Sequence, residues 1–115
     1  MDTMTASRRR TAAAALARTM RPHARSAAAL LRALGNEQRL LILCNLADGE
    51  LSVGELHGRL TLSQSALSQH LAVLREEQIV ATRREAQVIY YALKPGAAAR
   101  VVGLLHDIYC GAGTR

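Results

Sequence analysis

The sequence predicts a mainly α-helical domain that carries one small β-hairpin, an α+β fold. The chain has 115 residues, of which 50% are hydrophobic, and this is enough for one domain with a single core. It contains no Phe or Trp and only three Tyr, so the core must be aliphatic, which suits packed helices better than a β-sandwich. Apolar residues follow helical spacing over most of the chain, and only one stretch after Gln78 is β-branched and aromatic.

Two helices are predicted in the first half of the chain. Pro22 suits the first turn of a helix that Gly35 then ends. Asn36 is expected to cap the next helix, in which the run "LLILCNL" is apolar nearly all round. This second helix should therefore lie at the centre of the core, and we expect Cys44, which lies within the run, to be buried.

The next two helices form a predicted helix-turn-helix. Ser52 and Glu55 in "LSVGEL" have the spacing of a capping box, which marks the start of a short helix. After "RLTLS", Ser63 is expected to cap a longer helix. The inward face of that helix carries leucines at i, i+4 and i+7 spacing, namely Leu67, Leu71 and Leu74. A short helix, a tight turn and a longer helix define this motif.

A hairpin and a last helix complete the predicted fold. The runs "IVATRR" and "QVIYYAL" flank a polar "EA" and indicate two paired strands. The last helix has one apolar stripe, and Leu104 lies off it. The stripe comprises Ala98, Val101, Val102, Leu105, Ile108 and Tyr109. Apolar residues on two sides of one helix need two partners, so we expect this helix to pack on its own domain and on a second subunit, giving a homodimer.

Positive charge is concentrated at the start of the chain. Residues 1–25 hold six Arg against one Asp, a formal +5, whereas residues 26–115 carry only +1. We divide the chain into a basic arm, residues 1–21, expected to be partly disordered, and a winged helix-turn-helix domain, residues 22–115. Attraction of that domain to phosphate must come from local clusters such as Arg83 and Arg84.

The composition of the arm is also typical of an organelle transit peptide or a twin-arginine signal. Arg18, however, interrupts the apolar run well short of a signal's hydrophobic region, and no stretch of the chain approaches the ~18 apolar residues of a membrane span. The two cysteines do not form a secretory disulfide framework. We therefore expect a cytoplasmic protein with no membrane partner.

The outward face of the longer predicted helix is polar and uncharged. Its candidate DNA-binding residues are Ser63, Gln64, Ser65, Ser68, Gln69 and His70, although a lone His is more often structural. Short side chains let a helix approach base edges in the major groove, where Gln pairs with adenine and Ser donates or accepts. Arg83 and Arg84 would contact the neighbouring phosphates or the minor groove. An isolated stretch of this kind could equally be a solvated face, but the capped helix before it and the basic hairpin after it favour binding to double-stranded operator DNA.

From about Leu30 to Cys110 the chain resembles the ArsR/SmtB family of winged-helix repressors. The stretches "LRALGNEQRLLIL", "LSVGEL", "LSQSALSQHLAVLRE" and "TRREAQVIYYAL" match its pattern in order and spacing. The resemblance implies a homodimer built on the first and last helices of the domain, DNA recognition by the helix from Ser63, and release of DNA when an inducer binds. We expect no enzyme activity and no cofactor.

The residues available to sense an inducer are two cysteines. Ser52 and Gly54 stand where metal-sensing members of the family place a Cys-x-Cys pair, so we expect no metal site. Cys44 and Cys110, 66 positions apart, resemble the pair of the persulfide-responsive BigR/SqrR-like branch. That resemblance implies that reactive sulfur species bridge the two cysteines and that DNA is then released. A direct disulfide needs Cα atoms ~5.5 Å apart, and a chain of sulfur atoms relaxes that limit.

Other interpretations stay open. Cys44 could be a small core hydrophobe and Cys110 an incidental tail residue. The repressor could respond to a metal, a metalloid or a general oxidant, or the winged helix could bind another protein. A thiol enzyme would need an exposed, activated thiolate, and the predicted burial of Cys44 argues against it.

Overall fold

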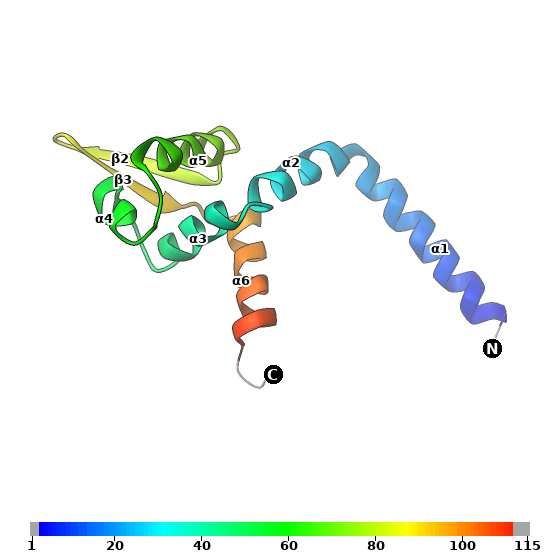
Figure 1. The fold of residues 1–115 in the computed structure, drawn as a ribbon. Helices are drawn as coiled ribbons and strands as arrows, with labels where there is room; N and C mark the ends of the chain where they lie inside the picture. Colours follow the sequence, from blue (N-terminus) through cyan, green and yellow to red (C-terminus); the bar gives the residue numbers. More distant parts are fainter. Residues whose placement is uncertain (1–2, 112–115) are drawn as a thin grey trace. The chain divides into compact units, whose positions relative to one another are not determined.

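The structure is a computed structural model that describes residues 3–111 (Figure 1). Its elements in chain order are α1 (Thr3–Met20), the 3₁₀ turn η1 (Arg21–His23), α2 (Ala24–Leu34), α3 (Glu37–Leu46), β1 (Leu51–Ser52), α4 (Val53–Gly58), α5 (Gln64–Glu76), β2 (Val80–Glu85), β3 (Val88–Leu93) and α6 (Ala97–Cys110). The predicted class and order of elements are confirmed, with α1 and β1 added. Among the described residues, no helix is both long and apolar enough to cross a membrane.

The chain forms two compact units that divide between Leu31 and Arg32. In the first unit Thr3–Met20 form an 18-residue helix, and the partial disorder expected of the arm stays a prediction. Alanine, the best helix former, is the commonest residue of α1, and this explains the helix. No residue from 6 to 31 is fully buried, so this unit has no core of its own. The predicted boundary of arm and domain at residues 21 and 22 stays a prediction.

The fully buried part of the core of the second unit is aliphatic, as predicted. Its fully buried side chains are Ile42, Leu43, Leu46, Leu56, Leu67 and Leu74. Helix α3 supplies three of them and contacts α5, β3 and α6, which confirms its central position. Burial of these side chains provides most of the driving force for folding, at roughly 25 cal/mol per Å² of apolar surface.

Side-chain caps decide where the central helices begin. Asn36 caps α3, because its side chain accepts a hydrogen bond from a backbone N–H in the first turn. Ser52 Oγ accepts from the Glu55 N–H at 3.1 Å while Glu55 Oε1 accepts from the Ser52 N–H at 2.8 Å, which confirms the capping box. Ser63 Oγ accepts from the Ala66 N–H at 3.1 Å and starts α5. Each cap satisfies N–H groups that a helix start leaves without partners.

The three strands form an antiparallel sheet in the order β1-β3-β2. The β2–β3 hairpin runs in register from Val80 opposite Leu93 to Glu85 opposite Val88 and projects beyond the helices of its unit (Figure 1). Its two-residue turn begins at Ala86, with φ 57°, one position later than the polar pair in the sequence suggested. A non-glycine residue in this left-handed region is uncommon, and without an Asn-Gly pair the sequence did not mark the position of the turn.

Helix α6 buries only its first half. Ala98 and Val102 are buried, whereas Ile108 and Tyr109 are 49% and 77% exposed. A single chain therefore buries only the first part of the predicted stripe and leaves these last two residues at its surface. They join Leu104, which is 58% exposed, to form an apolar surface on the second half of the helix.

Candidate DNA interface and cysteine site

Helix α5 has a buried face and a polar, exposed face. Leu67, Leu71 and Leu74 are at most 3% exposed, as predicted. The opposite face consists of exposed side chains, namely Gln64, Ser65, Ser68, Gln69 and Ala72. These residues carry no charge, and all of them except Ala72 lie on the first two turns of the helix. Among the candidate DNA-binding residues, Ser63 also has a structural role, because its hydroxyl caps the start of α5.

His70 differs from its neighbours on α5. Its side chain is half-buried, and its Nδ1 lies 3.3 Å from Nη1 of Arg39. Arg39 also donates to the carbonyl oxygens of Ala33, at 2.6 Å, and Arg32, at 3.0 Å, near the end of α2. The pair therefore links the end of α2 to α3 and α5. This arrangement favours a structural role for His70, and no pattern in the sequence indicated Arg39 as its partner.

The two arginines of the hairpin have different surroundings. Arg83 Nε donates to Glu50 Oε2 at 3.2 Å, and Arg83 Nη1 donates to Glu85 at 3.3 Å. The Arg83 guanidinium also lies over the ring of Tyr90. Arg84 is exposed and forms no salt bridge within residues 3–111. The sequence-based prediction treated the two as equivalent phosphate contacts, whereas the structure leaves only Arg84 unengaged.

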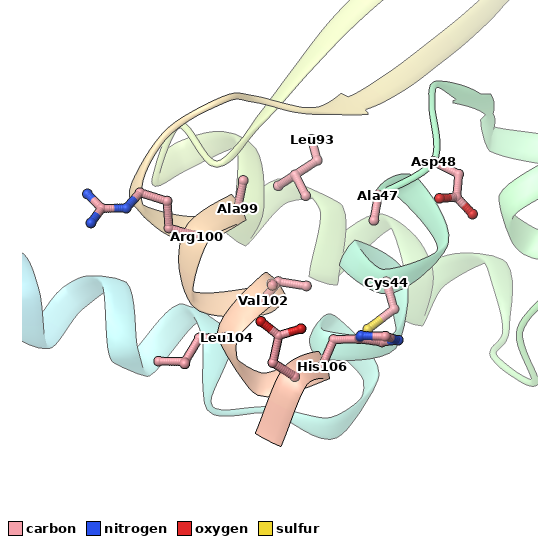
Figure 2. A pocket seen from close by; sticks show the side chains of 11 residues that line it. Cys44, Ala47, Asp48, Leu93, Ala99, Arg100, Val102, Leu104 and His106 are labelled. Atoms are coloured by element: carbon pink, nitrogen blue, oxygen red, sulfur yellow. The ribbon is translucent and has the colours of Figure 1, made fainter. Parts of the chain in front are cut away.

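Cys44 is exposed, so the prediction that it is buried is wrong. A helix has 3.6 residues per turn, and the face of α3 that carries Ile42, Leu43 and Leu46 leaves Cys44 on its side. There it lines an open depression of about 800 Å³ between α3 and α6 (Figure 2). The polar side chains of this depression are Cys44, Asp48, Arg100, His106 and Asp107.

Cys110 is exposed as well and is the last residue of α6. It follows His106 by one helical turn, about 6 Å along the axis, on the side of α6 that also carries Gly103. Gly103 and His106 both line the depression with Cys44. The thiol of α3 thus faces the side of α6 on which the second thiol lies. In the part of the chain that the structure describes, no three His, Cys, Asp or Glu side chains cluster as metal ligands would.

A capped short helix, a longer helix with an exposed polar face and a projecting hairpin with a basic residue are the parts of a winged helix-turn-helix transcriptional regulator. The family model "Bacterial regulatory protein, arsR family" matches residues 36–82, from the cap of α3 into β2. The chain belongs to this family of bacterial regulators, whose members bind DNA and are not enzymes.

Curated relatives extend the match over most of the domain. The transcriptional activator HlyU of Vibrio cholerae is 54% identical over 93 residues, which are 81% of this chain and 86% of the relative. The biofilm growth-associated repressor of Agrobacterium fabrum is 48% identical over 91 residues, 79% of this chain and 78% of the relative. The solved structure of reduced HlyU from Vibrio cholerae superposes with a TM-score of 0.75 at 53% identity, covering 80% of this chain and 97% of that one.

Proposed function

We propose that the protein is a cytoplasmic, homodimeric repressor that binds operator DNA through α5 and releases it when reactive sulfur species bridge Cys44 and Cys110. The observation that carries the proposal is that the exposed Cys44 lines the depression between α3 and α6, while the exposed Cys110 lies one helical turn beyond His106, which lines the same depression. Cytoplasmic thiols are normally reduced, so a bridge between them reports an oxidising or sulfur-rich condition. A persulfide, R–S–SH, is small enough to enter the open depression.

The proposed reaction has two steps. The Cys44 thiolate attacks the outer sulfur of the persulfide, the S–S bond of R–S–SH breaks, R–S⁻ leaves and takes up a proton, and Cys44 becomes a persulfide. The Cys110 thiolate then attacks Sγ of Cys44, the bond between Sγ and the outer sulfur breaks, and hydrosulfide leaves. The two cysteines lose two electrons, and these reduce one sulfane sulfur to sulfide. Further persulfide molecules would lengthen the bridge to a chain of sulfur atoms, which spans a larger separation than the ~5.5 Å between the Cα atoms of a disulfide.

A bridge would reach the DNA-binding surface through the core. It would tie α3 to α6, and α3 contacts α5 directly. The apolar surface of Leu104, Ile108 and Tyr109 on α6 suits a second copy of the chain. In a dimer the two α5 helices must fit half-sites one turn of DNA apart, ~34 Å, so a change in α6 at the subunit contact can prevent both from docking together.

Intact-mass measurement tests the bridge directly. After treatment of the reduced protein with glutathione persulfide, we expect loss of two protons, gain of a whole number of sulfur atoms or none, and a cross-linked peptide that contains Cys44 and Cys110. Hydrogen peroxide and glutathione disulfide serve as comparison reagents, and equal bridging by peroxide would instead support a general oxidant sensor. Release of DNA by persulfide without any cross-linked peptide would contradict the proposed switch.

The basic arm is proposed to add non-specific contacts to DNA phosphates. The exposed arginines of α1, Arg8, Arg9, Arg10 and Arg18, point around the helix rather than to one side, and residues 3–31 contain no acidic residue. A helix without an apolar face suits a polyanion better than a bilayer.

Deleting residues 1–21 tests the arm. We expect weaker binding to random-sequence duplex DNA and a smaller slope of log K against log[salt], by about 0.9 for each phosphate that the arm would otherwise neutralise. A full-length variant in which Arg8, Arg9 and Arg10 are replaced by Gln controls for the loss of the helix itself and should reproduce most of the effect. An unchanged slope in both variants would reject this role.

A further inference from the structure

The side chain of Arg83 reaches across the whole sheet. In the strand register Arg83 of β2 lies opposite Tyr90 of β3, and Tyr90 lies opposite Ser52 of β1. The guanidinium carbon of Arg83 is 4.4 Å from the centre of the Tyr90 ring. Beyond that ring, Nε and Nη2 both donate to the carboxylate of Glu50, the residue just before β1. The hairpin is therefore connected to the start of the helix-turn-helix by a two-pronged ion pair.

We propose that Glu50 competes with DNA phosphate for Arg83 and thereby sets the affinity that the hairpin contributes to DNA binding. The planar fork of a guanidinium binds a carboxylate and a phosphate in the same two-pronged manner, so one partner must leave before the other binds. The remaining Nη1 of Arg83 faces a second carboxylate, Glu85, at 3.3 Å. Arg83 therefore offers DNA no guanidinium nitrogen that is free of an acidic partner.

The exchange is feasible because the ion pair lies at the surface. The side chains of Arg83 and Glu50 are 47% and 41% exposed, and water and salt weaken a pair in that position. The bond to Arg83 lowers the pKa of the Glu50 carboxyl below its ordinary value, so Glu50 is ionised at neutral pH. Once a phosphate has displaced it from Arg83, the Glu50 carboxylate attracts a cation from solution. This uptake reduces the net number of cations that are released when the protein binds DNA.

Competition for Arg83 and simple charge repulsion predict different effects of Glu50 on DNA binding. If Glu50 only repelled the duplex, its effect on binding would be the same with or without Arg83. If Glu50 occupies Arg83, the two residues are coupled, and removing one changes the effect of removing the other. A double-mutant cycle measures this coupling.

The test uses Glu50→Gln, Arg83→Gln and the double variant in the full-length reduced protein, with a random-sequence duplex of about 30 base pairs and salt from about 50 to 200 mM. We expect Glu50→Gln to tighten binding about three- to tenfold and to steepen the salt slope by up to ~0.9, because one further phosphate contact becomes available. In the Arg83→Gln background, the same Glu50 change should tighten binding less than about twofold. Arg83→Gln alone should weaken binding only slightly.

Glu76→Gln is the matched control, since it removes the same charge from the exposed end of α5, where Glu76 forms no salt bridge with a described residue. Its effect should be the same in both Arg83 backgrounds. Equal tightening by Glu50→Gln with and without Arg83 would overturn the proposal, as would no tightening at all or no binding to any duplex. Coincident urea unfolding curves for the four proteins of the cycle would show that the fold is unchanged.

Discussion

Cys44→Ser is expected to leave DNA binding intact and to abolish the release of DNA by persulfide. Serine is close to cysteine in size, and Cys44 is exposed, so the substitution removes little packing from α3. The serine hydroxyl cannot form the covalent bond to sulfur that the bridge requires, so no bridge to α6 is possible. In the unaltered protein we expect persulfide to weaken operator binding by about 5- to 150-fold, the usual range of allosteric coupling. In the variant the change should be within about twofold. Fluorescence anisotropy with a labelled operator duplex measures both.

Cys110→Ser is the matched variant. Persulfide should also fail to release DNA from this variant, although the first step of the reaction remains available. Mass measurement should then show Cys44 carrying extra sulfur without a cross-link. That outcome separates sulfur transfer to one thiol from the bridge that we propose as the switch. Release of DNA that persists in both single variants would show that bridging is not the cause. It would leave the family assignment untouched, because that rests on α3 to β2.

Helix starts were predictable from the sequence because they depend on short-range hydrogen bonds. The cap of α3 by Asn36 and the capping box of Ser52 and Glu55 join residues three positions apart. A local pattern of that kind specifies both the donor and the acceptor. Strand β1 was missed for a related reason, since its residues Leu51 and Ser52 carry a helix-start pattern that concealed their pairing with β3.

The contacts within the candidate site were not predictable, because they join distant segments. Arg83 and Glu50 are 33 positions apart, and Arg39 and His70 are 31 positions apart. No periodicity of hydrophobic residues indicates such pairs. Cys44 was misplaced because a run that is apolar nearly all round does not show which side faces the core. In the folded domain the side of α3 with Ile42, Leu43 and Leu46 is buried. The side with Cys44 lines the depression next to α6.

Leu67→Ala is expected to destabilise the domain by about 2–5 kcal/mol, the usual cost of truncating a buried leucine. Leu67 is 1% exposed on the inward face of α5, so the change removes packing and leaves a cavity beneath the proposed recognition helix. Domains of this size have only about 5–15 kcal/mol of stability, so this variant is expected to lose a large part of it. Urea unfolding of the reduced protein, at one fixed concentration because dimerisation contributes to stability, measures the loss.

Gln69→Ala, two positions further along the same helix, provides the opposite case. Gln69 is exposed, so its loss should change the free energy of unfolding by less than about 0.5 kcal/mol. If α5 reads base edges, the same substitution should reduce discrimination between operator and random-sequence DNA. Leu67→Ala, studied at low temperature where it stays folded, should retain that discrimination. A stability loss in Gln69→Ala as large as that in Leu67→Ala would contradict the division of α5 into a packing face and a DNA-facing side, because only a buried side chain can cost that much.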